Sequence, residues 1–173
     1  QKLETGTTLD VQDVWGAKNG KTGEWEVLAV AAKPFESYDK TILKITGSTV
    51  TTVSDSGINY ALSGIWFLPN RHYYAAGSGV YEKHSLSETR WKNEPLDITT
   101  YYTNAIRGAN INDIFFCGAY GDFFHFNGIS WNSYRSQTNL PNGEYLSMNV
   151  LAGKVFAVGY ESPRAIVARG RRQ

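Results

Sequence analysis

Short apolar segments recur along the chain at a nearly constant spacing. They begin at residues 27, 73, 115 and 155, so consecutive copies start 40 to 46 residues apart. The four segments read VLAV, YYAA, FFCG and VFAV, and the third residue of each is small. Regular self-similarity with a period of about 20 to 50 residues is typical of repeat architectures such as propellers and solenoids. The spacing therefore predicts a repeat protein.

A second series of segments follows the first, beginning at residues 42, 80, 123 and 165. Turn residues come after the first three of these segments and lead to Val50, Trp91 and Trp131. A four-stranded propeller blade takes about 40 to 45 residues, which matches this repeat. No stretch has a sustained apolar period of about 3.6 residues, so almost no helix is expected. We therefore predict an all-β fold, a β-propeller of about four blades with four antiparallel strands each.

The repeat also predicts the domain organisation. One β-propeller domain is expected over residues 1–173. Residues 1–5 stand where a fourth strand belongs, and they are predicted to close the last blade. An alternative fits equally well: the chain is the C-terminal part of a larger ring and associates with the missing blades or with a second copy, because open sheet edges need partners. The expected blades are 9–53, 60–95, 103–135 and 144–170.

Three short motifs characterise the repeat more closely: Asp13-Val14-Trp15-Gly16, Asp113-Ile114-Phe115 and Asn127-Gly128-Ile129-Ser130-Trp131. Through these motifs the chain resembles the BNR/Asp-box-like propeller repeats of uncharacterised secreted bacterial proteins and of photosystem II assembly factors. The resemblance spans nearly the whole chain and implies a fold rather than an activity. It also implies a secreted or periplasmic location, and such propellers typically have more than four blades.

Charge and composition narrow the classes of partner. The chain has 17 basic and 16 acidic residues and a formal charge of +1. It therefore lacks the strongly positive electrostatic potential expected of a protein that binds nucleic acid or an anionic membrane. No run of about 18 apolar residues occurs, and no membrane insertion is expected. Cys117 is the single cysteine, and we expect it to be a small buried residue rather than a nucleophile.

Residues that could act in catalysis or bind a metal do not occur at the spacings of known catalytic or metal-binding motifs. The groups that a sialidase-like site would need are scattered one or two to a blade. His72, His84 and His125 fall at different blade positions without the spacing of metal ligands. No catalytic residue, metal or cofactor is therefore predicted, and the chain is expected not to be an enzyme.

Binding is the function that the repeat favours. Ligands of propellers usually meet the loops at one end of the central channel, and aromatic side chains there bury large areas at low entropic cost. We predict a non-catalytic binding or scaffold module for a protein or carbohydrate partner. The alternative is a carbohydrate-active propeller, either a sialidase-like hydrolase or a lectin. The residues predicted for the binding rim are Phe35, Tyr38, Arg107, Tyr120, Asp122, Tyr160, Glu161 and Arg164.

Overall fold

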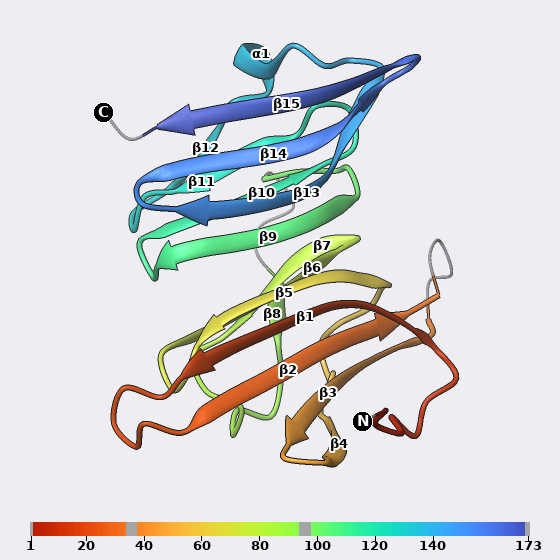
Figure 1. Cartoon of the computed structure of the whole chain (residues 1–173), viewed down its shortest axis with the longest axis vertical. Helices are drawn as coiled ribbons and strands as arrows, with labels where there is room; N and C mark the ends of the chain where they lie inside the picture. Colours follow the sequence, from red (N-terminus) through yellow and green to blue (C-terminus); the bar gives the residue numbers. More distant parts are fainter. Residues whose placement is uncertain (1, 34–37, 94–97, 172–173) are drawn as a thin grey trace. The chain divides into compact units, whose positions relative to one another are not determined.

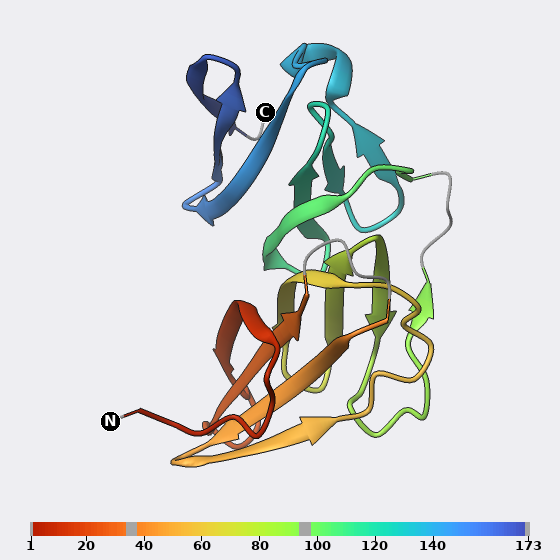
Figure 2. The same cartoon turned by 90° about the vertical axis from the view of Figure 1, so that its right-hand side faces the viewer.

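A computed structural model describes residues 2–33, 38–93 and 98–171 of the chain. These residues form antiparallel sheets and one short helix, α1 (Arg135–Thr138). They group into two compact units, unit 1 (1–94) and unit 2 (95–173), with two sheets in each (Figure 1 and Figure 2). In the described part of the chain, no helix is long and apolar enough to span a membrane.

Unit 1 contains two four-stranded sheets whose strands pair in chain order, as in the meander of a propeller blade. The strands of the first sheet are β1 (Asp10–Lys18), β2 (Trp25–Ala32), β3 (Lys40–Thr46) and β4 (Thr49–Val53). The strands of the second sheet are β5 (Leu62–Leu68), β6 (His72–Gly77), β7 (Gly79–Lys83) and β8 (Lys92–Asn93).

Unit 2 contains a four-stranded sheet and a three-stranded sheet, again paired in chain order. The strands of the third sheet are β9 (Thr103–Asn110), β10 (Asp113–Gly118), β11 (Phe123–Phe126) and β12 (Trp131–Ser133). The fourth sheet, drawn in blue in Figure 1, follows α1. Its strands are β13 (Gly143–Leu151), β14 (Lys154–Glu161) and β15 (Arg164–Arg171).

The first strand of each sheet carries an irregularity near its start. The pairing shifts by one residue at Gln12, Ser63, Asn104 and Leu146. Such a β-bulge bends the strand and increases its twist. At the first of these positions the side chain also bonds across the sheet, with Gln12 Nε2 donating to the Ala32 carbonyl at 3.1 Å. The repeat seen in the apolar segments therefore extends to the backbone geometry of the sheets.

The core of unit 1 combines buried side chains from both of its sheets. Trp91 is fully buried in it, and Trp15 packs against it. Both indoles are hydrogen-bonded: Trp15 Nε1 donates to the Phe67 carbonyl at 3.1 Å and Trp91 Nε1 to the Ser54 carbonyl at 2.9 Å. A buried indole normally needs such a partner for its N–H, so these two tryptophans join segments that are distant in sequence.

The core of unit 2 likewise lies between its two sheets and includes Phe115, Phe123, Tyr145 and Met148. Cys117 is fully buried there, and burial raises the pKa of its thiol. A buried thiol with a raised pKa is a poor nucleophile. This agrees with the expected role of Cys117 as a small apolar residue.

We expected a closing strand over residues 1–5, and the described part of this segment, residues 2–5, is not in a strand. Residues 2–9 contain no strand, and local bonds shape them instead. The Thr7 N–H donates to Thr5 Oγ1 at 3.4 Å, and the Leu9 N–H donates to Thr7 Oγ1 at 3.1 Å. Threonine side chains that bond the nearby backbone compete with strand pairing. The fourth sheet consequently has three strands among the described residues.

The first two strands of the third sheet approach each other closely at Gly118, and a substitution there tests this contact. A Cβ added there would overlap the Tyr102 carbonyl oxygen and lie 2.9 Å from the Thr103 Cα. We expect Gly118→Ala to lower the free energy of unfolding by about 1 to 3 kcal/mol, the usual range for overpacking. Gly20→Ala is the control, because nothing lies within 4 Å of its Cβ position. Urea denaturation followed by tryptophan fluorescence measures both, and equal stabilities would contradict the expected clash.

Candidate functional site

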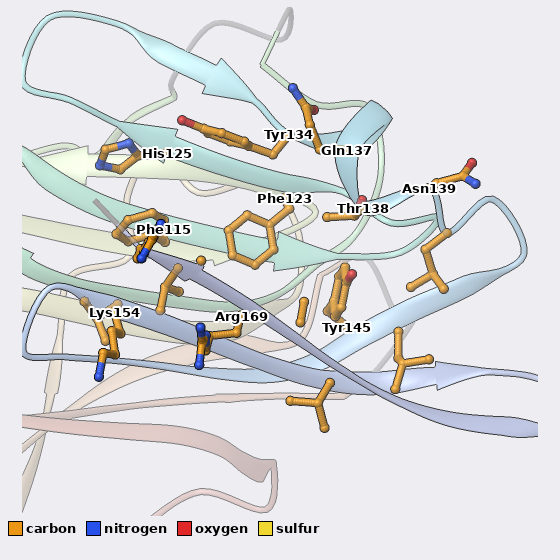
Figure 3. A pocket seen from close by; sticks show the side chains of 18 of the residues that line it. Phe115, Phe123, His125, Tyr134, Gln137, Thr138, Asn139, Tyr145, Lys154 and Arg169 are labelled. Atoms are coloured by element: carbon orange, nitrogen blue, oxygen red, sulfur yellow. The ribbon is translucent and has the colours of Figure 1, made fainter. Parts of the chain in front are cut away.

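A groove of about 860 Å³ opens between the two sheets of unit 2 (Figure 3). Residues of β10, β11 and α1 line it on one side, and residues of β14 and β15 line it on the other. Pockets that bind ligands commonly have volumes of about 300 to 1,000 Å³. The groove is therefore large enough to hold several side chains of a ligand.

Aromatic rings form the first wall of the groove. Phe115 and Phe123 meet edge to face with 6.3 Å between ring centroids, and His125 stacks on Phe115 at 4.2 Å. His125 Nε2 lies 2.9 Å from Oδ1 of the buried Asp113, which holds the imidazole against the wall. Tyr145 packs edge-on to Phe123 at 5.8 Å. These rings give the groove an apolar surface, visible in Figure 3.

Small apolar residues form the second wall. Val155 on β14 pairs with Gly170 on β15, and Ile166 and Ala168 pack against the core of unit 2. Arg169 and Arg171 of β15 also line the groove, and Figure 3 labels Arg169 among the lining side chains. The β15 wall of the groove therefore combines small apolar residues with basic ones.

The outer edge of β15 is open. β14 pairs with one side of β15 along all of Arg164–Arg171, and no described residue of unit 2 pairs with the other side. In the third sheet the corresponding position is filled, because β12 pairs with β11 there. An edge strand presents a row of backbone N–H and C=O groups that another strand can pair with. This open edge runs along the groove, since residues 166–171 line it.

A strained tyrosine lies at the turn between β10 and β11. Tyr120 and Gly121 have φ angles of 56° and 74°, and the Asp122 N–H donates to the Ala119 carbonyl at 3.1 Å. Turns with two positive φ angles favour Asn-Gly, and a bulky residue there is strained. The Tyr120 side chain is nevertheless 51% exposed. Thr138 Oγ1, which borders the groove, donates to the Gly121 carbonyl at 2.9 Å, so this turn adjoins the α1 end of the groove.

Tyr101 and Arg135 complete an aromatic and cationic group at this turn. The ring centroids of Tyr101 and Tyr120 are 4.9 Å apart, and Arg135 Cζ lies 4.4 Å from the centroid of Tyr101. Arg135 Nε also donates to the Tyr120 carbonyl at 3.1 Å. A guanidinium over an aromatic face is attracted by the ring quadrupole. We call Tyr101, Tyr120 and Arg135 the rim cluster.

Asp122 lies beneath the rim cluster and is 3% exposed. Thr99 Oγ1 donates to its Oδ2, and Arg135 Nε lies 3.8 Å from its Oδ1. Burial raises the pKa of the Asp122 carboxyl, while the Thr99 hydrogen bond and the Arg135 charge oppose that rise. The side chain therefore supports the turn from below and does not project from it.

The β14–β15 hairpin brings three of the predicted residues together: Tyr160, Glu161 and Arg164. Glu161 pairs with Arg164 and borders the groove. The Tyr160 hydroxyl donates to Glu144 Oε1 at 2.8 Å, and this hydrogen bond raises the pKa of the tyrosine hydroxyl. Two sets of predicted residues thus form in unit 2, one at this hairpin and one at the Tyr120 turn.

The other predicted rim residues do not join these two sets. Arg107 lies within β9 opposite Phe115, and its Nη1 donates to the Ile106 carbonyl at 2.8 Å. Tyr38 belongs to unit 1 and is 81% exposed, and Phe35 lies outside the described residues. The repeat pattern assigned these residues to one end of the propeller. It did not show which of them would lie close together.

Sequence reasoning missed Arg135 and the groove. Arg135 belongs to a four-residue helix after the last strand of the third sheet, and so short a segment has no periodic signal. The groove depends on the separation of two sheets.

Comparisons with known proteins support the fold. No family model matches the chain, and no curated protein matches it. The chain is similar to the solved structure of YCF48 bound to D1 peptide, with a TM-score of 0.66 and 12% sequence identity. The match covers 94% of this chain and 51% of that chain, so this chain spans about half the length of its neighbour. This likeness shows the fold and confirms the all-β, propeller-like prediction. The BNR/Asp-box resemblance and the secreted or periplasmic location stay predictions.

The raised pKa of Asp122 predicts how its contribution to stability depends on pH. Because the folded state holds this proton more tightly, the stability that the group contributes is fully present below its unfolded pKa of 3.8 and falls as the pH rises through the folded pKa. Asp122→Asn cannot titrate. We therefore expect the free energy of unfolding of the parent, relative to the variant, to be higher at about pH 3 than at about pH 7. Urea denaturation at both pH values measures this, with the exposed Asp10→Asn as control. The opposite trend would contradict it.

Proposed function

We propose that unit 2 binds an extended segment of a partner protein, which adds as a strand to the open edge of β15. The observation that carries this proposal is the free edge of Arg164–Arg171 beside an apolar groove. Strand addition of this kind takes affinity from main-chain hydrogen bonds and specificity from pockets for alternate side chains. The edge supplies the first requirement, and the groove supplies the second.

The geometry for such a strand already exists elsewhere in the fold. In the third sheet, β12 pairs with β11, and its Trp131 ring packs 5.1 Å from the ring of Phe116. A bound segment would take the corresponding place in the fourth sheet. Its inward side chains would fall between Phe123 on one wall and Ile166 on the other, both of which line the groove. The segment would thus bury apolar side chains in the groove.

The charges on β15 indicate which side chains the other side of the bound segment should carry. Arg169 and Arg171 are exposed, border the groove and alternate along β15 with Ala168 and Gly170. Cross-strand neighbours of opposite charge stabilise a sheet, and like charges destabilise it. The segment that fits is therefore an amphipathic strand with apolar side chains at alternate positions and acidic side chains between them.

The structural neighbour supports a protein partner. The solved structure of YCF48 is a complex with D1 peptide, so a propeller-like fold of this kind can hold a peptide. The carbohydrate alternative receives no such support. The proposed role is binding without turnover.

The rim cluster extends the proposed site at the α1 end of the groove. Tyr120 is exposed although its backbone is strained, and residues held in unfavourable φ/ψ regions concentrate at functional sites. A segment that leaves the groove at this end would meet the rings of Tyr120 and Tyr101. Tyr160, on the neighbouring hairpin, is the other exposed aromatic residue proposed for this rim.

A labelled peptide of eight residues, the length of β15, tests strand addition. One peptide alternates Ile and Glu, and its control has the same composition in two blocks. We expect the alternating peptide to bind at least about tenfold more tightly by fluorescence anisotropy, a difference of about 1.4 kcal/mol. Hydrogen exchange of residues 164–171 should slow only with the alternating peptide. Equal affinities, or unchanged exchange in β15, would overturn the proposal.

Charge reversal locates the bound peptide on β15. The double variant Arg169→Glu/Arg171→Glu should weaken binding of the alternating peptide by about tenfold or more, because two attractive neighbours become repulsive. The matched control is Arg71→Glu/Arg90→Glu, which changes two exposed arginines of unit 1. Circular dichroism checks that both variants fold. If both lose affinity alike, the peptide responds to net charge and not to this edge.

Tyr120→Asn separates the binding role of the rim from its role in folding. Asparagine suits the positive φ of this turn, so stability should stay within about 1 kcal/mol of the parent even though ring contacts are lost. We expect the affinity for a peptide extended beyond the α1 end of the groove to fall severalfold. Anisotropy titration and thermal denaturation measure the two effects, and undiminished affinity would remove the rim cluster from the site.

A further inference from the structure

Two histidines and a glutamate converge on one face of the second sheet in unit 1. β6 begins at His72, and β7 contains Glu82 and ends just before His84. The pairing of Tyr73 with Lys83, and of Tyr74 with Glu82, places His72 across from His84 on the same face. One potential ligand atom from each of His72, Glu82 and His84 lies within 4.8 Å of the other two.

The distances are close to those of a coordinated metal ion. Metal–ligand bonds of about 2.0 to 2.2 Å in a tetrahedral arrangement separate ligand atoms by roughly 3.4 Å. His72 Nε2 and Glu82 Oε2 are now 2.7 Å apart, and the ring centroids of the two histidines are 4.5 Å apart. Small side-chain rotations would bring all three atoms to coordination distance without moving the strands.

The surroundings hold the ligands in place. The His72 ring stacks on Tyr74 with 4.5 Å between centroids and 14° between planes. The His84 backbone N–H donates to Glu88 Oε1 at 3.0 Å. This hydrogen bond to the Glu88 carboxylate fixes the chain just after β7. His72 and Glu82 have side chains 14% and 19% exposed, whereas His84 is exposed. An ion could therefore enter from the His84 side and meet two partly desolvated ligands.

We propose that His72, Glu82 and His84 form a binding site for a divalent transition-metal ion such as Zn²⁺. Imidazole ligands suit zinc, copper and nickel, whereas calcium and magnesium prefer sites made of oxygen atoms alone. Three protein ligands leave a position for water or for a group from another molecule. The cationic neighbour to consider is Lys92, which pairs with Glu82 on β8, while Lys83 is buried on the opposite face.

The separation of the ligands explains why the sequence did not predict this site. His72 and His84 are twelve residues apart and belong to different strands, so no short spacing motif contains them. The hairpin register between β6 and β7 brings them together.

Titration of Zn²⁺ into the full chain by isothermal calorimetry tests the proposal. We expect one zinc ion per chain to bind, and Mg²⁺ not to bind at the same concentration. His84→Ala and Glu82→Gln should each weaken zinc binding by about tenfold or more, since even the loss of a group that only supports a metal ligand typically costs about tenfold in affinity. The control Glu24→Gln changes an exposed carboxylate of unit 1 outside the cluster and should bind zinc as the parent does.

Absorption spectra of the Co²⁺-substituted chain provide a second readout that does not depend on affinity. Coordination by the cluster should give visible d–d bands in the parent and in Glu24→Gln, and these bands should be lost in His84→Ala. Thermal denaturation of each variant without metal shows whether it is folded. If zinc does not bind to the parent, or if His84→Ala keeps both the affinity and the bands, the cluster is an ordinary hydrogen-bonded group and the proposal is wrong.

Discussion

Each sheet of this protein must have its faces covered and its edges paired, and most of the structure follows from that requirement. The second strand of a sheet shows it best. All six residues of β10 (Asp113–Gly118) are buried, because neighbouring strands flank it and side chains cover both of its faces. Buried backbone groups need partners, and buried faces need apolar side chains. The apolar segments of the repeat are these second strands.

β14 has the composition of such a strand without the burial. Val155 and Ala157 point into the core of unit 2, whereas Phe156 is 39% exposed and Val158 is 46% exposed. The fourth sheet thus has an apolar outer face as well as an open edge at β15. Compared with a fully covered sheet, the fourth sheet of unit 2 thus exposes more apolar surface on its face and more backbone hydrogen-bonding groups at its edge. The proposed binding of a partner strand would cover part of this surface.

Tight turns and strand register determine where the other polar and aromatic side chains of the candidate sites lie. Tyr120 keeps an aromatic ring exposed on a strained backbone, and Arg135 reaches that ring from the helix that follows the third sheet. In unit 1, the register of the β6–β7 hairpin brings His72 Nε2 to 2.7 Å from Glu82 Oε2. Neither arrangement requires any change in the strands that support it. A repeat fold can therefore carry different side-chain chemistry in each copy while its packing stays the same.

The sequence by itself determined the strand-rich repeat, its period and the buried identity of Cys117, because apolar spacing and turn residues are local properties. It also indicated the hairpin that carries Tyr160, Glu161 and Arg164. Only the tertiary structure decided that residues 2–9 form no strand, that no described residue of unit 2 pairs with the outer edge of β15, and that His72 and Glu82 lie in contact. The physical reason is the same in each case. Pairing between distant segments depends on which strand edges meet in space, and a pattern along the chain does not contain that information.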